Sequence, residues 1–208
     1  MVEHKIGVLG GTFDPVHLGH LIVAEEIRLK LGLQEVLLIP AGAPWLKEEE
    51  AITAAEHRLE MAILATASNP YLNVSTVEID RAGATYTVDT VVDLRAGLGA
   101  AARIFFIAGF DAVAEMPRWK NARRLLDLCE VVAVPRPGYQ KLDLRSLERD
   151  IPEAGQRIRK VDVPQIDISA TEIRRRVAAG QSVRYLVPEP VEEYIARHRL
   201  YSEGGRGR

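Results

Sequence analysis

The sequence predicts an α/β fold built on a doubly wound parallel sheet. The first observation behind this prediction is that short apolar runs alternate with amphipathic stretches along the 208 residues. The second is that the apolar runs are rich in β-branched residues, which is typical of strands buried on both faces of a sheet. Because crossovers between parallel strands are right-handed, we expect ligands at the carboxyl ends of these strands.

The expected strands and helices follow one another in alternation. We expect strands at Ile6–Leu9, Val36–Ile39, Leu72–Val74, Ile104–Ile107 and Val131–Val134, with a sixth at Arg159–Val163. We expect helices at Leu18–Leu31, Thr53–Ala67, Val88–Leu98, Arg118–Leu128 and Ala170–Ala179. In the first of these helices apolar residues fall close to helical spacing, and Gly32 is expected to supply its stop.

The remaining segments are less regular. The segment between Pro135 and Pro164 is more polar and contains Pro and Gly, so we expect an irregular connection with a short helix near Leu144–Arg149. Residues 1–201 are expected to form one domain with a small helical part at its C-terminal end. The Gly- and Arg-rich residues 202–208 are expected to form a disordered tail.

Composition excludes several classes of protein. A net charge of −2 and a pI near 6.2 give no support for binding nucleic acid or an anionic membrane. The charged segment Met1–Leu9 does not resemble a signal peptide, and no run approaches the roughly 18 apolar residues of a membrane span. The single cysteine, Cys129, lies in an apolar stretch and is expected to be buried. We therefore expect a soluble cytoplasmic protein, and a homo-oligomer is compatible with the sequence.

The strongest functional signal follows the first expected strand. It is the run Gly10-Gly11-Thr12-Phe13-Asp14-Pro15-Val16-His17-Leu18-Gly19-His20. The glycines allow a ligand to approach the backbone, and a helix starting near His17 presents free N–H groups and a partial positive charge to an anion. His17 and His20 share one helix face, where each imidazole can donate a hydrogen bond to a phosphoryl oxygen, more strongly when protonated. The run thus predicts a polyphosphate site, with Gly19 leaving room for the ligand.

Three other interpretations of this run remain open. The histidines would be incidental to a capping loop, or they would belong to a zinc site, although no Cys or Glu stands nearby at ligand spacing. The third is a dinucleotide-binding glycine loop, but Gly7-Val8-Leu9-Gly10-Gly11 lacks the last glycine of the dehydrogenase pattern.

A second phosphate-binding element is expected in the run Ile168-Ser169-Ala170-Thr171-Glu172-Ile173-Arg174. Ser169 followed by Glu172 is the pattern of a capping box that opens a helix. A capped helix start can also hold phosphate, because Ser169 and Thr171 carry hydroxyl groups and Arg174 carries a forked set of donors. Arg175 and Arg176 are expected to be solvated charges.

The two elements resemble the signatures of the HxGH nucleotidyltransferase superfamily, and the match is nearest to the bacterial nicotinate-nucleotide adenylyltransferases. Matching pieces follow in the same order over about residues 4–201. The resemblance implies a Rossmann-like nucleotidyltransferase fold, with His17, His20 and Arg174 on the ATP triphosphate. It implies further ATP contacts from Gly10, Gly11, Thr12, Phe13, Gly19, Ile168, Ser169 and Thr171, and from Arg136 near the adenine.

The resemblance also implies a binding site for the second substrate, a pyridine mononucleotide. Thr85, Tyr86 and Thr87 would contact this nucleotide, and Trp119 would stack on its ring. Asp111, after Gly109, corresponds to a family residue near the ribose or adenylate. Many relatives have Pro-Pro-His-Lys or Pro-Pro-His-Arg where this chain has Pro-Trp-Leu-Lys, so Lys47 keeps the basic end and Trp45 is a candidate substitute contact. Asp14 would orient a histidine or the loop.

The reaction implied is adenylyl transfer from ATP to nicotinate mononucleotide, giving the deamido form of NAD and pyrophosphate. Mg²⁺ would enter with ATP, held mainly by phosphate oxygens and water rather than by side chains. Nicotinamide mononucleotide, phosphopantetheine or a CTP-dependent acceptor would use the same chemistry. Outside this class, the alternative is an ATP-binding module without catalysis.

Overall fold

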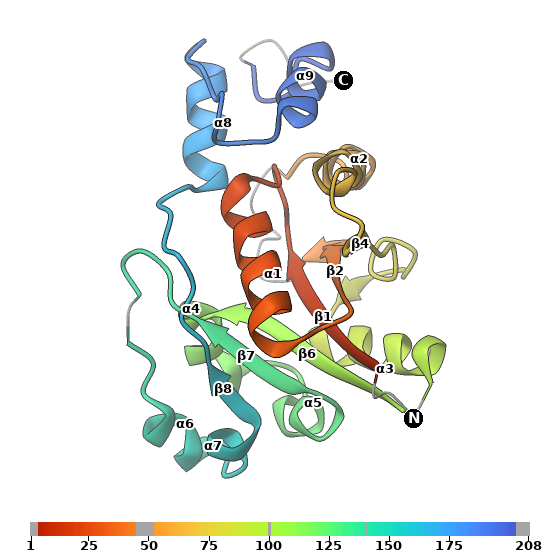
Figure 1. Cartoon of the computed structure of the whole chain (residues 1–208), viewed down its shortest axis with the longest axis vertical. Helices are drawn as coiled ribbons and strands as arrows, with labels where there is room; N and C mark the ends of the chain where they lie inside the picture. The colour runs from red at the N-terminus through yellow and green to blue at the C-terminus, as the bar shows by residue number, and fades with distance from the viewer. Residues whose placement is uncertain (1–3, 45–51, 100, 140, 203–208) are drawn as a thin grey trace.

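The computed structural model describes residues 4–44, 52–99, 101–139 and 141–202, and its centre is a parallel sheet (Figure 1). Within these ranges six strands pair in the order β4-β2-β1-β6-β7-β8. Their bounds are His4–Gly11 (β1), Glu35–Pro40 (β2), Leu72–Val74 (β4), Ala102–Gly109 (β6), Glu130–Val134 (β7) and Ile158–Lys160 (β8). The strand order reverses between β1 and β6, which is where an open α/β sheet binds its ligand. The predicted doubly wound fold is confirmed.

Helices cover both faces of this sheet. The longer ones are α1 (Leu18–Leu31), α2 (Ala55–Thr66), α3 (Thr87–Leu98), α8 (Ala170–Ala178) and α9 (Glu189–Arg197). The shorter ones are α4 (Phe110–Ala114), α5 (Ala122–Leu128), α6 (Leu144–Asp150) and α7 (Ala154–Arg157). Apolar residues of α3 to α7 form a core with one face, and those of α1, α2, α8 and α9 form a core with the other.

The sheet residues alternate between these two cores, as expected for strands buried on both faces. Along β6, Ile104 and Phe106 belong to the first core, whereas Phe105 and Ile107 belong to the second. In Figure 1, α8 and α9 lie at the end of the molecule away from the N-terminus, beyond the start of α1. The C-terminal helices therefore extend the second core past the edge where the strands end.

Several predicted boundaries are wrong by a few residues. The helix expected at Arg118–Leu128 begins at Ala122, because Asn121 has a left-handed φ of 51° that precludes a helical turn there. The helix expected at Thr53–Ala67 begins at Ala55. The sixth strand ends at Lys160, although the Val161 N–H still donates to Ala133 O at 2.9 Å.

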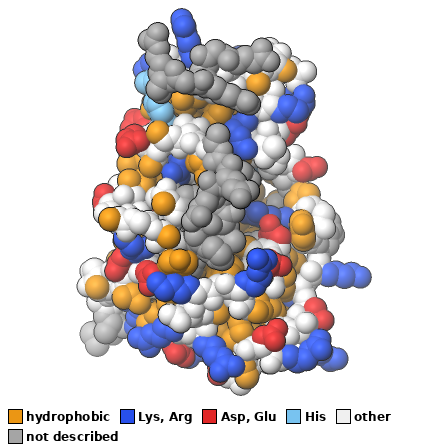
Figure 2. All heavy atoms as spheres, turned by 180° about the vertical axis from the view of Figure 1, so that it is seen from behind, with side chains coloured by type: hydrophobic (Ala, Val, Ile, Leu, Met, Phe, Trp, Pro, Cys, Tyr) orange, Lys and Arg blue, Asp and Glu red, His pale blue; other side chains and the backbone are white. Residues whose placement is uncertain are grey.

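Other elements have no counterpart in the sequence prediction. These are α4, α7, a 3-10 turn at Met116–Arg118, and a parallel pair of two-residue strands, β3 (Ala43–Pro44) and β5 (Ala84–Thr85). Of the expected tail, Ser202 alone falls within the described residues. No helix in the described ranges is long and apolar enough to cross a bilayer. Acidic and basic side chains are intermixed on the face shown in Figure 2, in keeping with the near-neutral net charge.

Candidate active site

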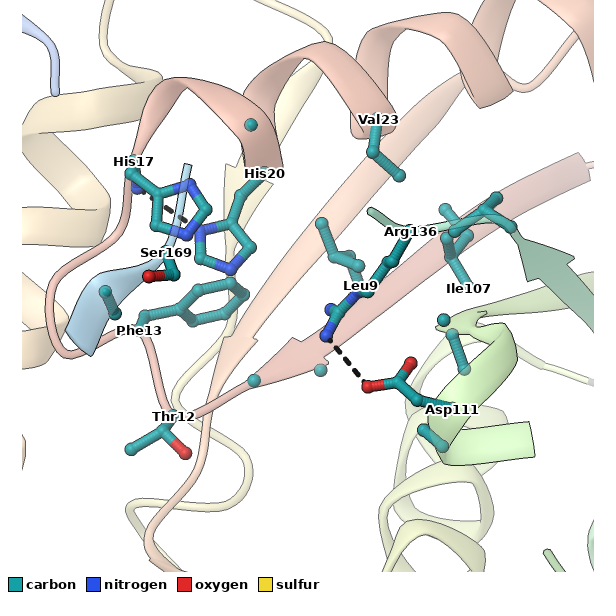
Figure 3. A pocket seen from close by; sticks show the side chains of 18 of the residues that line it. Leu9, Thr12, Phe13, His17, His20, Val23, Ile107, Asp111, Arg136 and Ser169 are labelled. Atoms are coloured by element: carbon teal, nitrogen blue, oxygen red, sulfur yellow. Dashed lines mark hydrogen bonds and ion pairs between the residues drawn. The ribbon is translucent and has the colours of Figure 1, made fainter. Parts of the chain in front are cut away.

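A cavity of about 650 Å³ lies at the carboxyl ends of β1, β6 and β7 (Figure 3). Its walls come from three regions far apart in sequence, at residues 9–23, 106–119 and 163–174, together with the loop after β7. Every residue that the sequence predicts to contact ATP lines it: Gly10, Gly11, Thr12, Phe13, His17, Gly19, His20, Arg136, Ile168, Ser169, Thr171 and Arg174. The two predicted phosphate-binding elements therefore face one shared space.

The two histidines are stacked at the start of α1. His17 is the N-cap residue, with an extended backbone, and its ring centroid lies 3.7 Å from that of His20. The backbone N–H of His17 donates to Nδ1 of His20 at 3.2 Å. The edge of the Phe13 ring packs against His20, with 4.9 Å between ring centroids, so His20 is held from two sides (Figure 3).

Burial keeps both imidazoles neutral. It lowers the pKa of His17 to about 4, with a further contribution from the Arg136 guanidinium. The pKa of His20 lies well below its usual value. Burial is the main cause, and His17 and Arg136 add smaller contributions. Each ring would donate more strongly if protonated, but in the free protein both imidazoles are neutral. His17 Nδ1 is buried and has no hydrogen-bond partner among the described residues, so it can take one from a ligand.

Gly19 lines the cavity beside the His17 ring. A Cβ at this position would lie 3.1 Å from His17 Nδ1 and 3.2 Å from His17 Cε1. The glycine thus makes room for the imidazole. Gly11 makes similar room for Phe13, whose ring would lie 3.0 Å from an added Cβ.

The start of α8 forms the opposite wall. Ser169 is its N-cap, and its Oγ accepts from the Glu172 N–H at 3.2 Å. The Glu172 carboxylate pairs with Arg175, which is exposed, and with Arg176, which is partly buried, and neither arginine lines the cavity. Arg174 instead lines the cavity, and its Nη1 donates to Asp14 O at 2.8 Å. This bond joins the two phosphate-binding elements directly.

Arg136 and Asp111 meet across the cavity. Arg136 Nη1 lies 3.4 Å from Asp111 Oδ2, and Figure 3 shows the two side chains reaching toward each other from opposite walls. A Cβ on Gly109 would overlap Asp111 Oδ1 and would lie 2.7 Å from Arg136 Nε. Glycine at position 109 is therefore required for this pair. Asp111 Oδ1 is buried with no hydrogen-bond partner in the described part of the chain.

A second cavity, of about 440 Å³, adjoins the first. Thr87, Asp111 and Trp119 line both cavities, and Tyr86 lines the second. The Trp119 ring stands edge-on to Phe106, with 6.1 Å between centroids, and is only partly buried, so part of it faces the cavity. The residues predicted for the pyridine nucleotide thus gather beside those predicted for ATP.

Comparison with known proteins agrees with this arrangement. A cytidylyltransferase-like family model matches residues 8–176. A protein of Dehalococcoides mccartyi named probable nicotinate-nucleotide adenylyltransferase is 44% identical over 201 residues, covering 97% of this chain and 98% of that protein. One of Moorella thermoacetica with the same name is 46% identical, covering 95% and 91%. The chain belongs to the nicotinate-nucleotide adenylyltransferase family.

Solved structures share the fold of this family member. The nicotinic acid mononucleotide adenylyltransferase of Plasmodium falciparum, complexed with NaAD, superposes with a TM-score of 0.77 at 18% identity. The alignment covers 95% of this chain and 97% of that one. A second structure of the same parasite protein, complexed with APC, gives a TM-score of 0.75 at 18% identity.

Two of the predicted contact residues, Asp14 and Thr85, also hold neighbouring segments in place in this member of the nicotinate-nucleotide adenylyltransferase family. Asp14 borders the cavity, but its carboxylate accepts from the Tyr201 hydroxyl at 2.6 Å and from the Thr53 N–H at 3.2 Å, so it orients the loop and not a histidine. Thr85 uses its hydroxyl to bond Ala43 O at 3.3 Å, which ties β5 to β3. Trp45 and Lys47 lie outside the described residues.

Sequence reasoning missed Arg58. This side chain is 1% exposed, and it bonds backbone oxygens of three separate segments. Its burial could have been predicted from the sequence. Arg58 is at helical spacing from Met61, Ala62 and Ala65, which form the buried face of α2. A charged residue on a buried face needs partners, and here the partners are loops around the active site.

Proposed function

We propose that the protein transfers the adenylyl group of ATP to nicotinate mononucleotide, forming nicotinate adenine dinucleotide and pyrophosphate in NAD biosynthesis. The observation that carries this proposal is that the starts of α1 and α8 line one cavity, with His17 and His20 on one wall and Ser169 and Arg174 on the other. Two helix N-termini with these donors suit a triphosphate. The names of the relatives at 44–46% identity support the choice of reaction.

In this reaction the 5′-phosphate of the mononucleotide is the nucleophile. A phosphate monoester has a second pKa near 6 and is mostly a dianion at neutral pH, so it needs no general base. One of its oxygens attacks the α-phosphorus, the bond from that phosphorus to the bridging oxygen breaks, and pyrophosphate leaves with the electron pair. Alignment of the two substrates can supply roughly 7–11 kcal/mol of the barrier reduction.

The protein groups stabilise charge that develops on the phosphates. His17 and His20 act as neutral donors to the triphosphate, Arg174 adds a positive charge, and Thr12 and Ser169 are secondary donors. Mg²⁺ enters as part of the ATP substrate, held mainly by phosphate oxygens and water. The described residues contain no group of three or more His, Cys, Asp or Glu side chains placed to hold a metal.

The second cavity is the proposed site of the pyridine nucleotide. It shares Trp119, Thr87 and Asp111 with the ATP cavity, so nucleotides bound in the two cavities would lie next to each other. Trp119 offers an aromatic face for the pyridine ring. Asp111 and Arg136 stand between the two binding spaces and would contact ribose or adenylate groups.

We also propose that this activity belongs to the cytoplasm. The thiol of Cys129 is buried, and burial raises its pKa to about 12, so little reactive thiolate forms.

An acceptor panel tests the proposed reaction. The protein is mixed with Mg²⁺ and ATP, and pyrophosphate is measured with nicotinate mononucleotide, nicotinamide mononucleotide or phosphopantetheine as acceptor. We expect the highest kcat/KM with nicotinate mononucleotide. Pyrophosphate release with another acceptor alone would reassign the substrate, and ATP binding without release from any acceptor would identify a non-catalytic binding module.

A further inference from the structure

The loop that joins β1 to α1 is held by residues that do not line the cavity, among them Arg58 and Tyr201. We call residues 12–17 the phosphate loop, because it carries Thr12 and His17 into the cavity. Both carboxylate oxygens of Asp14, in the middle of this loop, are occupied. Oδ1 accepts from the Tyr201 hydroxyl at 2.6 Å and Oδ2 accepts from the Thr53 N–H at 3.2 Å.

Arg58 continues this network to the start of the loop. Its Nε donates to Thr53 O at 2.8 Å, its Nη1 donates to Thr12 O at 2.9 Å, and its Nη2 donates to Gly42 O at 3.3 Å. The planar guanidinium therefore fixes three backbone segments in one geometry, which a lysine ammonium could not reproduce. Arg58 and Tyr201 are not among the residues that line the two cavities described above.

The C-terminal part of the chain joins the loop through two further bonds. Arg174 Nη1 donates to Asp14 O at 2.8 Å, and the Leu18 N–H donates to Leu186 O at 3.0 Å. Tyr201 follows α9 and is partly buried. Burial beside the Asp14 carboxylate raises the pKa of the Tyr201 phenol, so it remains a hydrogen-bond donor.

We propose that Tyr201 and Arg58 are positioning residues for adenylyl transfer: through Asp14, Thr53 and Thr12 they hold the phosphate loop where its donors meet the triphosphate. Tyr201 lies 187 positions from the carboxylate it holds, so turnover depends on a hydroxyl at the C-terminal end of the fold. This inference rests on the proposed function, which supplies the reaction that the loop serves.

The test compares two variants that each lose one phenolic hydroxyl. Tyr201→Phe removes the bond to Asp14. Tyr194→Phe is the matched control, because the Tyr194 hydroxyl lies 2.8 Å from His57 Nδ1 and joins α9 to α2 without reaching the phosphate loop. For Tyr201→Phe we expect kcat to fall about 10-fold to 100-fold, with KM for the mononucleotide within about twofold of wild type. For Tyr194→Phe we expect kcat within about twofold of wild type.

Hydrogen exchange supplies a measurement that does not depend on activity. In Tyr201→Phe the amides of His17 and Leu18, which are bonded in the native loop, should exchange at least about tenfold faster, and in Tyr194→Phe they should not. Arg58→Lys keeps the positive charge and removes the forked donors of the guanidinium. We expect it to lower kcat and to speed the exchange of the His17 and Leu18 amides, as Tyr201→Phe does. Arg58→Lys serves as the test variant if the Tyr201→Phe protein does not fold at the assay temperature.

Two results would overturn the proposal. One is a Tyr201→Phe enzyme with wild-type kcat and unchanged exchange of the loop amides. The other is an equal loss of kcat in both Tyr variants, which would indicate general loosening of α9. If wild-type protein formed no pyrophosphate, the proposed reaction would fail, while the exchange rates would still decide whether Tyr201 holds the loop.

Discussion

The backbone N–H of His17 donates to Nδ1 of His20, and this bond selects the tautomer of the His20 ring. Because a backbone amide can only donate, Nδ1 must be the acceptor and the ring proton must sit on Nε2. His20 is therefore a neutral donor before any substrate arrives. The stacked His17 ring and the low pKa of both imidazoles oppose a second proton on either ring.

Replacement of His20 by alanine should affect turnover more than binding of the mononucleotide. The variant loses a donor aimed at the triphosphate, so we expect kcat to fall about 10²-fold to 10³-fold, with KM for nicotinate mononucleotide within about twofold of wild type. Steady-state kinetics measure both quantities. The exposed His198 serves as the control, and His198→Ala should retain wild-type kcat. Near-normal turnover in His20→Ala would remove this histidine from the mechanism.

The buried imidazole of His17 should make the folded protein less stable in acid. An unfolded histidine takes up a proton near pH 6.5, whereas the pKa of His17 in the folded protein is about 4. Between these two pH values the unfolded state binds more protons, so the free energy of unfolding falls as the pH is lowered. At about 1.4 kcal/mol per pKa unit, the decrease from pH 7 to pH 4 is about 3 kcal/mol.

Urea unfolding at pH 7 and pH 4 measures this effect, and His17→Asn isolates it from the carboxylates that also titrate. The asparagine side chain carries no proton in this range, so the variant should lose less stability on acidification than the wild type does. The same loss in both proteins would contradict the assignment of a low pKa to His17.

Truncation of Trp119 should raise KM for the pyridine substrate more than KM for ATP. Stacking of a base on an aromatic side chain is worth about 1–3 kcal/mol, so an increase of about tenfold or more is expected in Trp119→Ala. Trp119→Phe keeps an aromatic face and should recover much of the affinity. An increase in KM confined to ATP would reject a stacking contact with the pyridine ring.

Gly109→Ala should impair activity by displacing the Asp111–Arg136 pair. The added methyl group would overlap Asp111 Oδ1, so one of the two side chains must leave its position between the cavities. We expect kcat/KM to fall about tenfold or more, with little change in Tm, because Asp111 and Arg136 are partly solvent-exposed.

Gly155→Ala is the matched control for this substitution. Its methyl group would overlap the carboxylate of Glu148, which is exposed and free to move, and which lies in α6, outside both cavities. Activity should be unchanged. Wild-type kcat/KM in Gly109→Ala would indicate that the Asp111–Arg136 pair has no part in binding or turnover.

Local patterns were sufficient to predict the elements that create the site. The helix expected at Leu18–Leu31 is α1 with the same bounds, and Gly32, with φ of 62°, ends it as expected. The apolar run at Ile6–Leu9 marked β1, and the following glycines and histidines line the cavity. These features depend on neighbours in sequence, so they could be predicted.

Features that depend on tertiary partners could not be predicted in the same way. The pKa of His17 follows from its burial, and the role of Asp14 follows from a hydroxyl 187 positions away. Asn121 adopts a left-handed φ and so interrupts a helix. Asparagine tolerates this conformation but does not require it, so the interruption could not be predicted from the residue type. The Arg58 contacts required the positions of Thr12 and Gly42, which only the folded backbone supplies.

The two walls of the ATP cavity come from opposite ends of the chain, at residues 9–23 and 163–174. During synthesis on the ribosome, the strands of the sheet would all emerge before α8 does, and a nascent chain of that length would have the first wall without the second. Such a chain has no enclosed place for a triphosphate. A chain that stops before residue 163 would therefore lack one side of the proposed triphosphate site and would release no pyrophosphate.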